Sequence, residues 1–289
     1  MQADGHIGGS FTSANTTTFR PLWFISQNAS DGSILYFALL HSVLSSLGFV
    51  NLQFSYSITA AGNWHIRLYS RDWNTIVNIL TGYFSQVYGA KFMAFQKILR
   101  IYAIKNELSI IAKNSLGYYL LCVEIVNLVY TLSPAANAIR VISWSDKLSY
   151  IIPAAMRSII DTFKSPVYPD NTIPLTFAFI FGFFIGDGNF YIRIRSSASS
   201  FQFIPQWRLI QKTTVINDVM MKAIGAYLKS FGVNSFLDYS GSNTTLKVEG
   251  KDAVTLIFSM ILPLNHFWFW RTSQLTVMHQ LVKYFELST

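Results

Sequence analysis

The chain has 289 residues, of which 51% are hydrophobic, and its 22 basic against 14 acidic side chains give a net charge of +8. This length allows a substantial core without covalent cross-links, and the lone Cys122 excludes a framework of intramolecular disulfides. The charge favours a polyanionic partner, either nucleic acid or an anionic membrane surface. The best candidate for a membrane span, residues 117–133, is too short and contains Glu124 and Asn127, so we predict no membrane protein.

The first predicted elements are a helix and a strand with one polar face. Apolar residues recur at helical spacing in "SILYFALLHSVLSSLGF", residues 33–49, and Gly48 suits a left-handed helix end. Further on, "HIRLYSR", residues 65–71, alternates as a strand does. Its polar side chains share one face, and Asp72 then opens another helix.

A long apolar region separates two parts of the chain. Residues 106–172 are predicted to be mostly helical and to pack against one or both neighbouring domains. The segment ends in "SPVYPDNTIP", whose prolines break helices and mark a boundary. We therefore divide the chain into residues 1–105, the connecting segment 106–172, and residues 173–289.

The stretch "FIFGFFIGDGNFYIRIR", residues 179–195, joins an apolar helix to a basic strand. Gly182 and Gly186 are four residues apart, so they lie on one helix face, where they would allow a second helix to approach closely. Asp187 follows at the helix end. In the strand, Arg193 and Arg195 share a face that is opposite to the isoleucines.

The two parts of the chain repeat each other. Residues 21–50 align with residues 205–234 at a constant offset of 184, so that "LSSLGF" matches "LKSFGV", and an offset of 180 places Asp72 on Asp252. An offset of 183 places Asp4 on Asp187. The separations between each Asp and the Gln that follows are 23 and 24 residues, which pairs Gln27 with Gln211.

The repetition changes how the two aspartates are interpreted. A single Asp between glycines is ordinarily a turn residue. Two carboxylates at equivalent helix ends, beneath two basic strand faces, instead favour a site for divalent cations held over a phosphate backbone. Such cations would polarise the scissile phosphates and activate water.

In its repeat and its two aspartate motifs, the chain resembles the LAGLIDADG homing endonucleases of the single-chain, two-motif type common in organellar introns. "FIFGFFIGDGNF" resembles a divergent signature motif, and "QADGHIGGSF" resembles the end of one, with its preceding helix missing from the sequence. The resemblance implies an α+β fold of duplicated, pseudo-symmetric αββαββα domains whose saddle-shaped antiparallel sheets lie in the DNA major groove. It also implies a mitochondrial or chloroplast location.

The resemblance also implies roles for individual residues. Asp4 and Asp187 would be the metal-binding catalytic acids, assisted by the carbonyls of Ala3 and Gly186. Gln27 and Gln211 match the position that orders water, and Lys91 matches an active-site lysine. The basic strand faces add a set of expected DNA contacts, namely Arg20, Arg67, Tyr69, Arg193, Arg195, Arg208, Lys212 and Lys247.

These features predict a monomeric, site-specific endonuclease that hydrolyses both strands of double-stranded DNA with Mg²⁺ or another divalent cation. Two alternatives stay open. The first is an intron RNA maturase or a catalytically inactive nucleic-acid-binding relative, which the missing first helix favours. The second is a membrane-associated structural protein, which only the apolar content supports.

Overall fold

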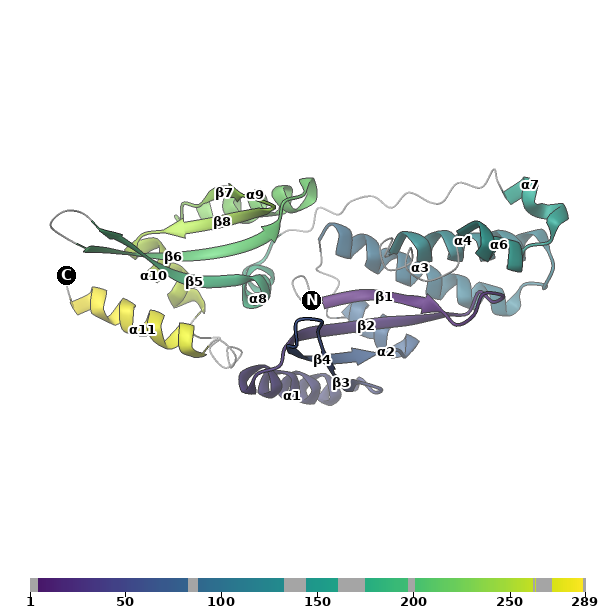
Figure 1. The fold of residues 1–289 in the computed structure, drawn as a ribbon, viewed down its shortest axis with the longest axis horizontal. Helices are drawn as coiled ribbons and strands as arrows, with labels where there is room; N and C mark the ends of the chain where they lie inside the picture. Colours follow the sequence, from purple (N-terminus) through teal and green to yellow (C-terminus); the bar gives the residue numbers. More distant parts are fainter. Residues whose placement is uncertain are drawn as a thin grey trace.

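The computed structural model describes residues 5–82, 88–132, 144–160, 175–196, 201–261, 263 and 272–287. Within them the chain forms two four-stranded antiparallel sheets with helices packed against them, as predicted (Figure 1). The first half contains β1 (Gly5–Phe11), β2 (Phe19–Asn28), α1 (Asp31–Ser46), β3 (Gln53–Ile58), β4 (Trp64–Ser70) and α2 (Trp73–Gly82). The helices that follow are α3 (Ala90–Ile110), α4 (Leu116–Leu132), α6 (Trp144–Ile151), the 3₁₀ turn η1 (Ala154–Met156) and α7 (Arg157–Ile160).

The second half repeats the order of the first and adds a helix at each end. It contains α8 (Phe177–Asp187), β5 (Gly188–Ser196), β6 (Phe201–Lys212), α9 (Val215–Lys229), β7 (Phe236–Ser240), β8 (Asn243–Glu249), α10 (Lys251–Ile261) and α11 (Thr272–Leu287). The strand orders, β1-β2-β4-β3 and β5-β6-β8-β7, are the same. The duplication predicted from the sequence is therefore present in the backbone.

Strand pairing gives the register of the repeat residue by residue. Ile25 pairs with Gly5 and Leu68, and Leu209, which is 184 residues later, pairs with Gly188 and Leu246. The offsets of 184 and 183 are therefore confirmed for the first two strands of each half. Between Leu68 and Leu246 the offset is 178, not the 180 that the sequence comparison indicated.

The equivalence of Asp72 and Asp252 is consequently wrong by two residues. Asp72 precedes α2 and caps it, with its Oδ2 accepting a 2.8 Å hydrogen bond from the backbone N–H of Thr75. Asp252 lies inside α10, after its first residue Lys251, and the corresponding N-terminal place belongs to Gly250. A shift of two residues preserves strand alternation, so the predicted faces of β4 and β8 remain correct.

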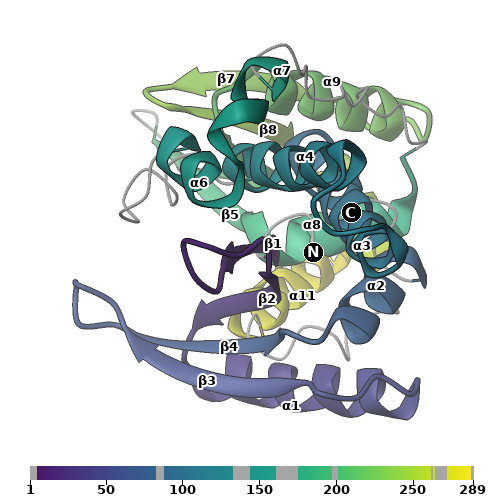
Figure 2. The same cartoon turned by 90° about the vertical axis from the view of Figure 1, so that its right-hand side faces the viewer.

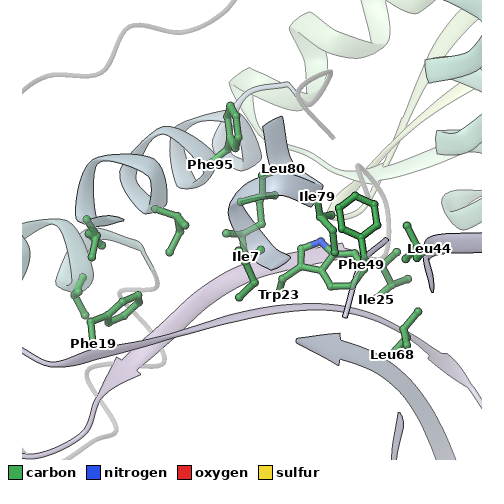
Figure 3. Close-up of a cluster of buried hydrophobic side chains, with 14 of the residues drawn as sticks. Ile7, Phe19, Trp23, Ile25, Leu44, Phe49, Leu68, Ile79, Leu80 and Phe95 are labelled. Atoms are coloured by element: carbon green, nitrogen blue, oxygen red, sulfur yellow. The ribbon is translucent and has the colours of Figure 1, made fainter. Parts of the chain in front are cut away.

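Each sheet buries one face against its own helices. Trp23 and Trp207 occupy equivalent positions and are 0% and 1% exposed, each at the centre of a separate apolar cluster. Figure 3 shows the Trp23 indole between Ile7, Ile25 and residues of α2. Gly48 and Gly232 end α1 and α9 with φ of +87° and +79°, the left-handed conformation that the sequence predicted there.

The connecting helices pack on the first half. Ile125, Leu128 and Val129 of α4 belong to the same buried cluster as Trp23. Glu124, also on α4, is buried and accepts two hydrogen bonds from Arg100 of α3, of 2.7 and 2.9 Å. α3 itself runs without a break through residue 105. No helix among the described residues is both long and apolar enough to cross a bilayer.

The two halves meet near the start of each sheet. Figures 1 and 2 both draw the beginning of β1 beside α8, the helix that leads into β5. Tyr88, which precedes α3, packs against the apolar cluster of the second half. This arrangement brings the start of β1, which follows the Asp4–Gly5 sequence, close to α8, which ends at Asp187.

Candidate functional site

Asp187 is the last residue of α8, and a side chain of β6 holds its carboxylate in place. Gln211, near the end of β6, donates a 2.5 Å hydrogen bond from Nε2 to Asp187 Oδ2. The adjacent Gly188 is required on steric grounds, because a Cβ there would lie 2.0 Å from the Phe184 ring. Because Gly188 has no side chain, the backbone can pass close to the Phe184 ring as the helix ends. The Asp187 carboxylate then points toward β6. Asp187 and Gln211, two residues that the resemblance assigned to one site, are therefore in contact with each other.

The corresponding region of the first half is described only from Gly5 onward. The predicted residues Ala3 and Asp4 lie outside the described residues. Two neighbours can be placed: His6 is on the face of β1 opposite to the buried Ile7, and Lys91 is in the first turn of α3. Burial lowers the pKa of His6, and the positive charges of Lys91 and Arg67 lower that pKa further. The predicted Lys91 therefore lies close to the start of β1.

Gln27 follows the inward alternation of β2, on the same face as Trp23 and Ile25. Gln211 has the same relation to Trp207 and Leu209 on β6. The two glutamines therefore occupy equivalent places, each at the end of the second strand of its sheet. This equivalence is what the constant offset of 184 predicted.

The expected close approach of a helix at Gly182 is not found among the described residues. Gly182 is exposed on α8, and no described atom lies within 4 Å of the position that a Cβ would occupy. Among the described residues, Gly182 therefore leaves an open strip on α8. Its spacing with Gly186 indicated a shared face correctly but could not supply a partner for it.

The open face of the first sheet is basic, with no acidic residue in any of its four strands. Arg20 is exposed on β2, and Arg67 and Tyr69 lie on the same face of β4. Phe24 organises the centre of this face. Its ring stacks on His6 with a centroid separation of 4.7 Å, and the Arg67 guanidinium lies 4.2 Å from its centroid.

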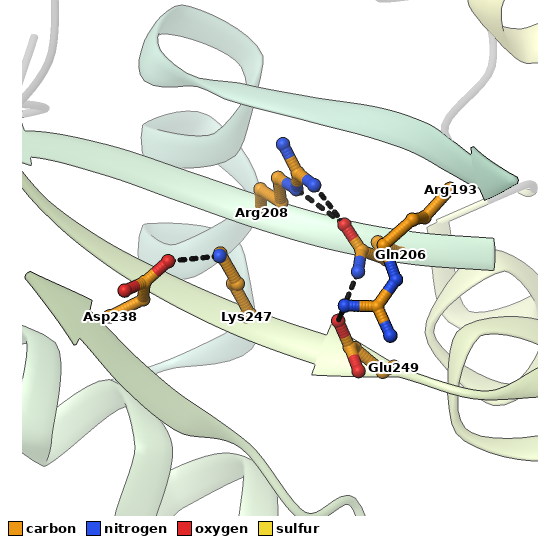
Figure 4. Close-up of polar contacts among 6 residues, drawn as sticks. All are labelled: Arg193, Gln206, Arg208, Asp238, Lys247 and Glu249. Carbon is orange, nitrogen blue, oxygen red and sulfur yellow. Dashed lines mark hydrogen bonds and ion pairs between the residues drawn. The ribbon is translucent and has the colours of Figure 1, made fainter. Parts of the chain in front are cut away.

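The open face of the second sheet combines basic residues with two carboxylates. The predicted Arg193, Arg195, Arg208, Lys212 and Lys247 all follow its outward alternation. Asp238 forms an ion pair with Lys247, and Glu249 lies 3.6 Å from Arg193. Figure 4 shows Gln206 between Arg208 and Glu249, hydrogen-bonded to both. Gln206 was not among the residues predicted to bind DNA, although its strand parity with Arg208 placed it on this face.

The residues present provide one end of a site for a hard divalent cation. Asp187 supplies a carboxylate, and Gly186 precedes it with a backbone carbonyl, both oxygen ligands of the type that Mg²⁺ and Ca²⁺ prefer. The described residues contain no group of three or more His, Cys, Asp or Glu side chains that could hold a metal ion. A cation at this place would therefore need ligands beyond those side chains, such as phosphate oxygens and water.

Comparison with solved structures identifies the fold. The chain superimposes on the LAGLIDADG homing endonuclease I-GzeII in complex with its DNA target with a TM-score of 0.64, at 12% identity over 100% of this chain and 90% of that one. The LAGLIDADG meganuclease I-AabMI bound to uncleaved DNA gives a TM-score of 0.62, at 16% identity over 99% and 89%. I-SmaMI, bound to an uncleaved DNA target in the presence of calcium ions, gives 0.56, at 13% identity over 88% and 78%.

No family model and no curated protein sequence matches the chain. The likeness therefore rests on the backbone, and it is to the single-chain form with two domains. The expected fold class, two pseudo-symmetric α+β domains with antiparallel sheets, is confirmed.

Proposed function

We propose that this protein binds double-stranded DNA across the open faces of its two sheets and hydrolyses both strands with the help of divalent cations. The observation that carries the proposal is the Asp187–Gln211 pair, which lies at the end of α8 where the two halves meet and next to basic strand faces. Support also comes from the shared fold, because the structures similar to this chain include meganucleases bound to DNA.

The open faces suit a polyanion for electrostatic reasons. Lys and Arg side chains that contact phosphates release condensed counterions, which gives sequence-independent affinity. The first sheet offers Arg20 and Arg67 without any strand carboxylate, so its face attracts phosphate throughout. On the second sheet five basic side chains exceed the two acidic ones, Asp238 and Glu249. DNA affinity should therefore fall as the salt concentration rises.

Each residue of the acidic site has a separate task in the proposed hydrolysis. Gln211 fixes the rotation of the Asp187 carboxylate by donating to one of its oxygens. Asp187 and the Gly186 carbonyl, with Asp4 and Ala3 from the other half, would hold the cation. When bound, the cation would stabilise charge on the scissile phosphate and lower the pKa of the attacking water. Lys91 contributes positive charge near β1, which favours the negative charge that develops during hydrolysis.

A cleavage assay with matched Asp-to-Asn variants tests the catalytic assignment. The substrate is a plasmid that carries the matching DNA without the intron, incubated with Mg²⁺. We expect the wild type to linearise the plasmid and Asp187→Asn to act at least about 100-fold more slowly, since partners of metal ligands alone are worth about 10–100-fold. Asp252→Asn, an exposed acid on α10, is the control and should cleave like the wild type. Equal cleavage by Asp187→Asn would contradict the assignment.

A second candidate function is nucleic-acid binding without cleavage, as in a maturase or an inactive relative. The basic open faces of the two sheets support it as well, because they attract nucleic acid whether or not the acidic site acts. Salt-sensitive binding of DNA or intron RNA, together with absence of any cleavage in Mg²⁺ or Mn²⁺, would support this candidate over the nuclease.

A further inference from the structure

The open face of the second sheet contains a glutamine that is completely buried. Gln206 is 0% exposed although it lies on the outward side of β6, because its neighbours cover it. Its Nε2 donates to Glu249, and its Oε1 accepts from Arg208. The amide orientation follows from charge, since a flipped amide would point N–H groups at a guanidinium and an oxygen at a carboxylate.

This cluster holds the Arg208 guanidinium in one orientation before any partner arrives. Its Nε–H and one Nη2–H both donate to Gln206 Oε1, the former at 2.7 Å. The planar group also lies over the Tyr191 ring, with Cζ 3.9 Å from the ring centroid. Glu249, which anchors Gln206, is itself 3.6 Å from Arg193. The Arg208 guanidinium is therefore fixed by two hydrogen bonds to Gln206 in its plane and by the Tyr191 ring against its face.

The contacts with Gln206 use the edge of the guanidinium formed by Nε and Nη2. The edge formed by Nη1 and Nη2, farthest from the backbone, makes no contact with Gln206. A guanidinium carries five N–H donors, so one Nη1–H and one Nη2–H remain as a parallel pair at its tip. Figure 4 shows one Arg208 nitrogen turned away from Gln206. Two parallel donors match the O6 and N7 acceptors of guanine in the major groove, whereas adenine presents a donor beside its acceptor.

We infer that Arg208 reads a guanine in the half-site bound by the second sheet, and that the buried Gln206 is the positioning residue that sets its orientation. The inference rests on the proposed DNA-binding function. Arg208 pairs directly with Asn189, two residues after Asp187, so this guanine lies in the inner part of the half-site, near the cleavage position. The first sheet has Phe24 at the place of Arg208 and Leu22 at that of Gln206, so the preference is confined to one half-site.

Selection from a random double-stranded DNA pool tests this inference. The full chain is incubated with the pool in EDTA, so that binding is measured without cleavage, and bound DNA is sequenced. We expect the wild type to enrich a site with guanine at one inner position, preferred about tenfold or more over other bases. Arg208→Lys keeps the positive charge but loses the two parallel N–H donors. The preference for guanine at that position should therefore be lost, while the base preferences at all other positions stay unchanged.

Gln206→Met tests the positioning role separately. It should weaken the guanine preference several-fold, while its affinity for the same site with that guanine replaced stays close to that of the wild type. A merely structural defect would lower affinity for both sites equally. Arg157→Lys, an exposed arginine on α7, is the control and should reproduce the wild-type motif.

The outcomes separate the inference from the function on which it rests. If the wild type enriches no sequence, the proposed DNA recognition fails and the inference fails with it. If the wild type enriches a motif that Arg208→Lys leaves unchanged, only the inference is overturned. A uniform loss of affinity with unchanged base preferences would show that Arg208 contacts a phosphate, which also overturns it.

Discussion

The two sheets differ in where the ion-paired carboxylates of the described residues lie. Beside the first sheet, the buried Glu124 of the connecting segment pairs with Arg100 in the helical layer, and no strand carries an acid. In the second half Asp238 and Glu249 lie on the open face, in contact with basic residues that were predicted to bind DNA.

This difference has a physical consequence. Carboxylates on a binding face lower its attraction for a polyanion, but they orient the basic side chains beside them. The first face is therefore the more uniformly attractive of the two, with the Phe24 stack at its centre. The second face is the more ordered, because Gln206 and Glu249 hold Arg208 and Arg193. A duplicated fold can thus serve two different recognition tasks.

The largest expected effect concerns the Arg100–Glu124 ion pair, in which the carboxylate is buried and the arginine is partly exposed. Arg100→Met would leave Glu124 buried without its guanidinium partner, which should lower the free energy of unfolding by about 3 kcal/mol. The double variant Arg100→Met/Glu124→Leu should recover most of this loss. Asp238→Asn removes the more exposed pair of the second sheet and should cost less than about 1 kcal/mol. Urea unfolding of the variants measures all three, and equal losses for the two pairs would contradict the comparison.

A second prediction concerns Lys147, which ties α6 to the turn between β1 and β2. The side chain is 1% exposed, and its Nζ donates to the carbonyls of Ser13 and Thr16, both at 2.5 Å, while lying 4.0 Å above the Phe11 ring. Burial lowers its pKa to about 8. The folded chain therefore binds fewer protons than the unfolded chain between about pH 8 and 10.5, so the stability contributed by this residue rises with pH there.

The measurement compares wild type and Lys147→Met by urea unfolding from pH 7 to 10. The unfolding free energy of the wild type should rise relative to the variant by about 2 kcal/mol between pH 7 and pH 10. Parallel pH profiles would show that Lys147 keeps an ordinary pKa and would contradict this prediction.

The smallest effect concerns the open strip on α8 in the second half. Gly182→Ala fills exposed space within a helix, so it should stabilise the protein by about 0.5–1 kcal/mol. Gly188→Ala is its contrast and should destabilise, because the new Cβ would overlap the Phe184 ring. Thermal unfolding measures both. A destabilising Gly182→Ala would mean that another helix covers the strip, as in the predicted pairing of signature helices.

Much of the fold was predictable from local patterns. Alternation assigned Arg67 and Arg193 to outward faces, and the glycines at 48 and 232 predicted two helix ends, because side-chain direction and left-handed backbone depend on a few neighbouring residues. The constant offset predicted that Gln27 and Gln211 occupy equivalent places, and the resemblance, not the offset, placed Gln211 beside Asp187. The two-residue error at Asp252 arose because the turns before β4 and β8 differ in length, and an error of two residues leaves the alternation of the strand unchanged.

The sequence by itself determined the duplication, the inward and outward sets of each strand and the equivalence of the two glutamines, since these follow from periodicity and spacing. Only the tertiary structure decided that Gln206 is buried beneath Arg208, that Lys147 reaches the first hairpin, and that no described atom lies close to Gly182. Such partners lie far apart along the chain or on neighbouring strands. Their contacts depend on how whole elements pack together, which no local pattern encodes.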